Sequence, residues 1–432
     1  MPNDSSRSAA QHSTRNPQLV VRARTILPIT APPVENGTVV VSGNRIQAIG
    51  AWSELKTKFA GAEIIDLGDV AVLPGLVNAH CHLDYTGMAG LWSSPRQFTD
   101  WIPLMLAAKA EWSYTDYARS WLNGAKMLLQ SGTTTVADIE AVPELLPEMW
   151  DATPLRIVSF LELTGVRSKL PPKEILAGAV DRIGALSHPR SSASLSPHAP
   201  YSTMPELLRL CAEIAREKRL PIAIHVAESV DEFDMFTHGR GKMFTWLQRN
   251  GRDMSDCGRG TPVAHLEHAG LLGDHLLAIH ANVLEPSDID LLARRHAHVV
   301  HCPHSHDYFQ HPPFRRRELA EAGVNVCLGT DSLATTRKTG RSPLQLNLFD
   351  EMRLLAQKDK TVSATEILRM ATVNGARALG MGGKTGELSP GTFADLIAVP
   401  FAGKIADVHD DVVHLTSTVS ASMVDGSWAI AP

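Results

Sequence analysis

The stretch LVNAHCHLDYTG, residues 76–87, ends an apolar run with two histidines two positions apart. Residues two apart along a β-strand share a face, so His80 and His82 can point together into an interior while Cys81 points outward. Two imidazoles on one face make half of a metal site. The same spacing occurs elsewhere in the chain, and for one pair alone a loop position is the more common explanation.

Further apolar, β-rich runs follow this stretch, each short enough for a buried strand. The intervals between them suit crossover helices such as 204–218 and 342–357, and a last helix over 363–379 begins with Ser363 and Glu366 in capping-box spacing. Repeated β/α units of this kind predict an α/β chain folded as a closed (β/α)8 TIM-type barrel. The eight predicted strands are VLPGLVNAHCH (72–82), TTTVADI (133–139), RIVSFLEL (156–163), SASLSPHAP (192–200), PIAIHVAE (221–228), LLAIHANV (276–283), HVVHCPHS (298–305) and NVCLGTD (325–331).

The two ends of the chain have a different pattern, with short alternating runs and turn signals over 18–72 and 383–432. The first segment predicts a hairpin that turns at Ser42-Gly43-Asn44, and the second turns at Asp425-Gly426. Neither segment alone has enough strands to bury a face, so we expect one small β-sandwich domain built from both ends. The barrel then spans 73–382, and residues 1–17 are expected to form a disordered tail.

Composition excludes several classes of function. The chain has 432 residues, 44% of them hydrophobic, with a net charge of -5, so no basic surplus indicates binding to nucleic acid or to a membrane surface. No apolar run approaches the length of a membrane span. The five cysteines form no CxxC pair, which favours a reducing, cytoplasmic location. We therefore expect a small-molecule substrate, and a homo-oligomer remains open.

Polar residues gather at the carboxyl ends of the predicted strands, where the active site of such a barrel lies. His80 and His82 end the first run, His225 the fifth and Asp331 the eighth, so this set is predicted to hold a divalent metal ion. Histidines with one aspartate suit zinc, although iron or manganese could use the same ligands. His198 and His280 end the fourth and sixth runs, respectively.

Glu228 lies three residues after His225, in the run HVAES. In a continuous strand these two side chains would face opposite ways, so the strand must end near Ala227 for Glu228 to turn over the site. A carboxylate beside a metal-bound water is suited to moving protons during hydrolysis. The alternative is a solvated acidic residue in a loop.

These motifs resemble a known family. LPGLVNAHCHLD, SPHAPYS, HVAES, AIHANVL, HCPHSH and LGTDSLAT are similar, in this order, to motifs of the amidohydrolase superfamily, in its branch of cytosine deaminases, adenosine-type deaminases and chlorohydrolases. The resemblance implies one metal ion on the four residues named above. It also implies that Glu228 and Asp331 move protons, that His280 holds or polarises the reacting group, and that His198 contacts the substrate.

A narrower resemblance concerns the substrate. NAHCHLDYTG, FTDWI, FLELTG and HCPHSHDYF are similar to the subgroup of aminodeoxyfutalosine deaminase and related purine-nucleoside deaminases. This implies attack by a metal-activated hydroxide on an amino-bearing ring carbon, followed by loss of ammonia. The alternatives are a cyclic amidase or an s-triazine or halide hydrolase using the same site, and a non-catalytic scaffold, which the complete ligand set disfavours.

The loops after the strands offer candidates for substrate contact, namely Asp84, Trp101, Arg167 and His304, for which surface or packing roles are the alternative. His306 stands where many relatives carry Asn, so specificity in that loop is expected to differ. No predicted strand ends in lysine, the residue that two-metal relatives usually place there, which favours a single metal.

Overall fold

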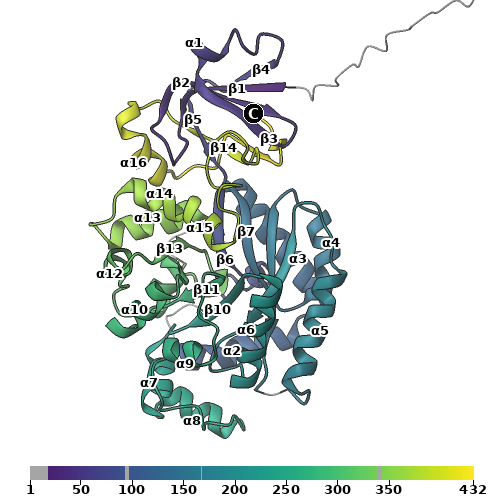
Figure 1. Cartoon of the computed structure of the whole chain (residues 1–432), viewed down its shortest axis with the longest axis vertical. Helices are drawn as coiled ribbons and strands as arrows, with labels where there is room; N and C mark the ends of the chain where they lie inside the picture. Colours follow the sequence, from purple (N-terminus) through teal and green to yellow (C-terminus); the bar gives the residue numbers. More distant parts are fainter. Residues whose placement is uncertain (1–17, 93–96, 167, 339–342) are drawn as a thin grey trace, which may run out of the picture.

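The computed structural model describes residues 18–92, 97–166, 168–338 and 343–432 (Figure 1), so the expected tail over 1–17 lies outside the described residues. Eight parallel strands follow one another in a single sheet, in the order β6 to β13. All eight predicted strands are confirmed, as β6 (Leu76–Cys81), β7 (Thr133–Glu140), β8 (Arg156–Leu163), β9 (Ser192–Pro197), β10 (Ile222–Val226), β11 (Leu276–His280), β12 (His298–His301) and β13 (Asn325–Leu328).

The barrel is closed between its first and last strands. The His80 carbonyl accepts hydrogen bonds from the backbone N–H groups of Thr330 (3.0 Å) and Asp331 (3.1 Å), and an isolated parallel bridge pairs Cys81 with Asp331. Since β6 and β13 are the two edges of the sheet, these contacts join the edges and close the sheet into the predicted TIM-type barrel.

Helices cover the outside of this barrel (Figure 1). The predicted helix over 204–218 is confirmed by α6 (Pro205–Lys218). The helix predicted over 342–357 begins later, at Leu348, where the Asn347 side chain accepts a hydrogen bond from the Phe349 N–H. The remaining helices are α1 (Trp52–Leu55), α2 (Phe98–Glu111), α3 (Tyr114–Gln130), α4 (Leu146–Asp151), α5 (Pro172–Ala185), α7 (Val230–His238), α8 (Lys242–Arg249), α9 (Pro262–His268), α10 (Pro286–Arg294), α11 (Pro303–Phe309), α12 (Arg316–Glu321), α13 (Leu348–Lys358), α14 (Ala364–Met370), α15 (Val373–Ala378) and α16 (Val408–Val413).

The prediction of one helix over 363–379 is wrong, because the helix breaks at Thr372 (φ −137°, ψ −97°) into α14 and α15. The predicted capping box of Ser363 and Glu366 is present. The break has a physical cause: the Ala371 carbonyl accepts a hydrogen bond from the Val77 N–H at the start of β6. This contact brings α15 against the barrel strands, where Ala376 and Ala378 join a buried cluster with Val77.

That buried cluster fills the barrel interior. Its members come from seven of the eight strands and include Ala137, Phe160, Leu277, Cys302 and Cys327. Both cysteines are fully buried and serve as small apolar residues of the core. Cys81 instead belongs to a cluster with side chains of α3, outside the barrel, as its position between two inward-facing histidines predicted.

Strands from both chain ends form a second, mixed sheet beyond one end of the barrel (Figure 1). The antiparallel pairing of β5 with β14 joins the two ends, and a bridge between Arg45 and Phe393 brings the edge of β3 back toward β14. One apolar core therefore lies within this folded sheet, with side chains from both segments. The strands are β1 (Gln18–Ile26), β2 (Val34–Ser42), β3 (Arg45–Ala51), β4 (Glu63–Asp66), β5 (Val70–Pro74), β14 (Leu396–Pro400), β15 (Ala421–Val424) and β16 (Ser427–Ile430).

Both predicted hairpins are present, and at the second one Asp425 (φ 52°) and Gly426 (φ 78°) adopt the left-handed conformation that a two-residue turn requires. β5 runs to Pro74, past the predicted boundary at residue 72. Among the helices of the described chain, we find none with the length and apolar character needed to cross a lipid bilayer.

A buried ion pair connects the barrel to the sheet of the chain ends. Arg156, at the start of β8 and 4% exposed, donates to Asp395 (3.1 Å) and to Asp425 (3.2 Å), and its guanidinium stacks on the Phe393 ring. The Asp395 carboxylate also accepts hydrogen bonds from the Thr385 hydroxyl and the Asp425 N–H. A fully hydrogen-bonded pair of this kind offsets the cost of burying its charges.

We expect Asp395→Ala to lower the free energy of unfolding by about 3–5 kcal/mol, because the substitution leaves the Arg156 charge buried without its main partner. Urea denaturation of the purified protein measures this loss. Glu213→Ala removes the partner of Arg209 in an exposed ion pair on α6 and is the control, with an expected loss below about 1 kcal/mol. Equal losses in the two variants would show that the buried pair does not stabilise the junction.

Candidate metal centre and active site

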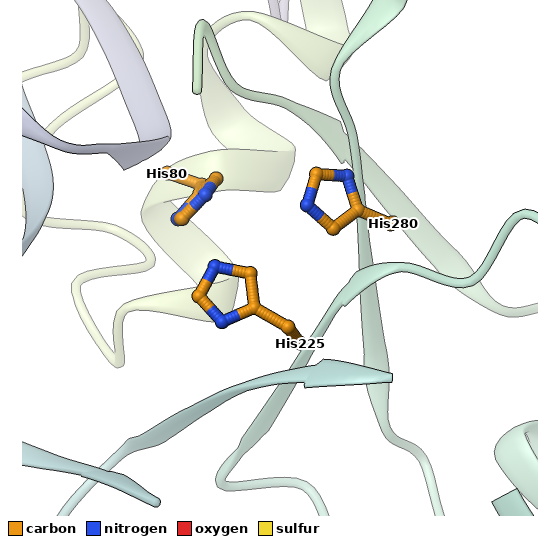
Figure 2. A group of neighbouring side chains, drawn as sticks. All are labelled: His80, His225 and His280. Atoms are coloured by element: carbon orange, nitrogen blue, oxygen red, sulfur yellow. The ribbon is translucent and has the colours of Figure 1, made fainter. Parts of the chain in front are cut away.

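Four histidines and one aspartate converge at the carboxyl ends of the barrel strands. His80 lies in β6 and His82 just after it, His225 in β10, His280 at the end of β11, and Asp331 just after β13. Asp331 Oδ1 lies 3.5 Å from His80 Nε2 and 3.8 Å from His82 Nε2. Figure 2 shows the rings of His80, His225 and His280 pointing toward one another from three strands. One ring nitrogen from each of these three histidines lies within 4.8 Å of the other two.

The nitrogen and oxygen atoms of this cluster are arranged as donors for a cation. His225 Nδ1 lies 2.9 Å from the His198 carbonyl, to which it can donate, and this leaves the Nε2 lone pair facing His82 Nε2 at 3.3 Å. The Nε2 atoms of His82 and His225 can form a hydrogen bond at this distance only if one of them carries a proton. His80 Nε2, 3.5 Å from Asp331 Oδ1, is buried and has no hydrogen-bond partner among the described residues. A buried, under-satisfied set of imidazoles around one carboxylate fits a divalent metal ion.

The backbone turns sharply where these strands end. Ala227 (φ 51°), His280 (φ 72°) and Asp331 (φ 54°) adopt left-handed conformations that non-glycine residues rarely take. β10 ends at Val226, so the turn at Ala227 confirms the prediction that the strand must stop before Glu228. Strained conformations of this kind persist only where surrounding contacts enforce them.

Glu228 lies beside the cluster, with Oε1 3.5 Å from His280 Nε2. Its side chain is buried, and burial together with the nearby Asp331 and Glu232 carboxylates raises its pKa well above the ordinary value. For Asp331, burial favours the neutral acid, but the surrounding His80, His280 and His82 outweigh it and lower its pKa well below the ordinary range. One carboxyl group can therefore donate a proton where its neighbour accepts one.

Glu232, in the first turn of α7, holds Glu228 in place. Its Oε2 accepts a hydrogen bond from the Glu228 N–H (2.9 Å), and the Asn282 side chain donates to the Glu228 carbonyl (3.0 Å). Glu232 is fully buried, and burial raises its pKa to about 8. Its role toward Glu228 is that of a hydrogen-bond acceptor, which does not depend on its charge.

A cavity lies next to the cluster and has two kinds of wall. The apolar wall is one face of α2, with Phe98, Trp101 and Met105 at helical spacing. The polar wall includes His198, whose Nδ1 lies 2.7 Å from the Ser202 hydroxyl, and the charged side chains of Lys109 and Glu162. Sequence reasoning missed Lys109 and Glu162, although Glu162 lies at the carboxyl end of the third predicted strand, where polar residues were expected.

The structure brings only part of the predicted substrate-contact set to this cavity. His198 and Trp101 line it, whereas Arg167 lies outside the described residues. Asp84 does not line the cavity: it is fully buried, and burial and the nearby Asp138 raise its pKa well above the ordinary value. His304 also lies elsewhere, with Nδ1 3.0 Å from the Glu351 carboxylate.

A family model for the amidohydrolase family matches residues 71–429, which include every strand of the barrel. The chain belongs to the amidohydrolase family. It is 34% identical over 411 residues to a 5-methylthioadenosine/S-adenosylhomocysteine deaminase of Syntrophobacter fumaroxidans, and the match covers 90% of this chain and 85% of that relative.

Solved structures show the same fold at lower sequence identity. An adenosine deaminase from Xanthomonas campestris with bound zinc superposes with a TM-score of 0.84 at 24% identity, covering 96% of this chain and 93% of that one. Aminofutalosine deaminase from Helicobacter pylori superposes with a TM-score of 0.83 at 21% identity, covering 95% and 99%. These likenesses support the assignment of the fold to the amidohydrolase barrel.

We expect Glu232→Leu to lower turnover by roughly 10²-fold with metal content unchanged, because the Glu228 N–H loses its acceptor and the carboxylate moves. Glu232→Gln should keep turnover within about threefold of the wild type, since a neutral amide oxygen can accept the same hydrogen bond. Steady-state kinetics and metal analysis of both variants measure this contrast. Equal losses in the two variants would mean that the charge of Glu232, and not its acceptor, matters.

Proposed function

We propose that this protein is a metal-dependent hydrolytic deaminase that acts on an adenosine-type nucleoside. The main observation behind the proposal is that four imidazoles, Asp331 and Glu228 converge beside one cavity. The cavity has one apolar and one polar wall. The deaminase relative that matches over most of both chains supports the same reaction.

The amidohydrolase family is metal-dependent, and the buried donor set described above fits such an ion. In this proposal His80, His82, His225 and Asp331 hold one divalent ion, with zinc favoured by three imidazoles and one carboxylate, and iron or manganese as alternatives. When bound, the ion would supply a Lewis acid that lowers the pKa of a water molecule toward neutrality.

The side chains around the donor set would then move the protons. Asp331, whose pKa is lowered, accepts a proton from the attacking water. Glu228, whose pKa is raised, donates a proton to the ring nitrogen beside the amino-bearing carbon. Its carboxylate then takes up the proton of the added hydroxyl group as the carbonyl forms, and passes that proton to the leaving amine. The proton that Asp331 accepted from the water finally returns to Glu228, which resets both carboxyl groups. His280, 3.5 Å from Glu228, would hold or polarise the reacting group, and His198 would contact the ring.

The wider setting is also part of the proposal. A small-molecule substrate is in keeping with a cavity that has the apolar face of α2 on one side and His198 and Glu162 on the other. A cytosolic location and assembly into a homo-oligomer remain predictions, the first of them in keeping with five unpaired cysteines.

The test is ammonia release by the zinc-loaded protein with adenosine, 5-methylthioadenosine, S-adenosylhomocysteine, aminodeoxyfutalosine, guanine, cytosine and an amino-triazine. We expect turnover of at least one adenosine-type nucleoside. Glu228→Gln should lower that turnover by about 10²–10⁴-fold while it keeps the metal, because an amide cannot deliver the proton. Turnover confined to the triazine, or near-wild-type rates in Glu228→Gln, would contradict the proposal.

We expect His82→Ala to lose metal and activity together, because the substitution removes a ligand from the donor set. The loss of metal affinity should exceed the roughly 10–100-fold that follows removal of an outer partner of a metal ligand. Elemental analysis after dialysis against a weak chelator measures it. His304→Ala is the control and should retain metal, since His304 pairs with Glu351 away from the cluster; full metal occupancy in His82→Ala would exclude His82 as a ligand.

A further inference from the structure

A partly buried ion pair in the cavity takes no part in the reaction described above. Glu162, near the end of β8, has Oε1 4.0 Å from Lys109 Nζ in the last turn of α2, and the two side chains are 14% and 22% exposed. The Lys109 ammonium also donates to the Tyr85 hydroxyl. All three residues line the cavity.

The Glu162 carboxylate has acceptor capacity that the protein does not use. At 4.0 Å, its contact with Lys109 is an ion pair without a hydrogen bond, and within the described parts of the chain no N–H or O–H group donates to it. Burial opposes ionisation of Glu162, but Lys109, His198 and His82 outweigh it and lower its pKa. A charged carboxylate that is partly buried and short of donors is favourable only where water or a ligand supplies them, and a bound substrate displaces the water.

The position of the pair indicates which part of a substrate would meet it. The reacting carbon must lie at the cluster of His80, His225 and Asp331, whereas Lys109 reaches the cavity from α2, on the same helix face as Trp101 and Met105. Neither side chain belongs to the group of donor atoms at the strand ends, so the pair can meet a part of the substrate other than the reacting carbon. In an adenosine-type nucleoside, the hydrogen-bond donors other than the amine are the ribose hydroxyls, two of which are vicinal.

We propose that Glu162 and Lys109 form a subsite for the ribose diol, with Glu162 accepting hydrogen bonds from the two hydroxyl groups and Lys109 orienting the carboxylate. This inference rests on the proposed function. A carboxylate has two oxygens and can accept both O–H groups of a diol at once. The apolar face of α2 excludes water from these bonds, so a substrate lacking the hydroxyls leaves the carboxylate unsatisfied.

The structure also offers a reading of the pair that involves no ligand. Asp84, Asp138 and Glu140 are buried nearby, and Lys109 lowers the pKa of Asp84 against the burial that raises it. If the pair only balances these carboxylates, its removal would change stability but would not change the preference for one nucleoside over another. The decisive quantity is therefore a ratio between substrates, not the rate on one of them.

The experiment compares kcat/KM for adenosine and 2′,3′-dideoxyadenosine in the metal-loaded wild type, Glu162→Gln and Lys109→Met. Calorimetric titration of the corresponding products, inosine and 2′,3′-dideoxyinosine, gives a readout independent of turnover. Hydrogen bonds to a charged group contribute about 1.5–3 kcal/mol, so we expect the wild type to prefer the ribonucleoside by at least about 10-fold. In Glu162→Gln this preference should fall to within about threefold, in kcat/KM and in product affinity.

Glu213→Gln, in the exposed pair with Arg209, is the matched control and should keep the wild-type preference. Lys109→Met should weaken the preference in the same direction as Glu162→Gln, with metal content unchanged. A wild-type preference that survives in Glu162→Gln, or equal use of both nucleosides by the wild type, would overturn the diol subsite while the proposed function stands. No turnover of any adenosine-type nucleoside would overturn both.

Discussion

The closure of the barrel is the constraint on which the rest of the structure depends. The His80 carbonyl accepts hydrogen bonds from the N–H groups of Thr330 and Asp331, and so one peptide group joins the first strand to the segment that follows the last. The side chains of His80 and Asp331 are brought within 3.5 Å by the same contact. The contact that closes the barrel therefore also brings His80 and Asp331 of the donor set together, and a slip of the strand register would disrupt both.

Several carboxyl groups lie in or beside the candidate site, with little contact with water. Asp331 and Glu228 are buried and Glu162 is partly buried, and each lies near a histidine or Lys109. Such an arrangement costs stability, as do the left-handed turns at Ala227 and His280. Burial of the apolar side chains in the barrel core offsets part of this cost.

Much of the fold and of the candidate site could be predicted from the sequence, because in a parallel barrel the two are linked. The eight strands were predicted from runs apolar on both faces, and strand ends are where polar side chains meet. The strand-end rule predicted His280 and Asp331 beside His80. It failed for Asp84 and His304, which follow strands but turn away from the cavity, toward buried carboxylates and toward Glu351. Loop direction depends on packing that local sequence does not encode.

The sequence by itself determined the period of the strands, the chemistry of the strand-end residues and the place where β10 must stop, because these depend on neighbours along the chain. Tertiary structure alone decided the break at Thr372, the distances among the imidazoles and the meeting of Lys109 with Glu162. Each of these needs groups far apart in sequence: a strand start that donates to Ala371, histidines from three separate strands, and a lysine of α2 that meets the end of β8. Contacts of that kind follow from the closure and packing of the whole barrel, which no local pattern specifies.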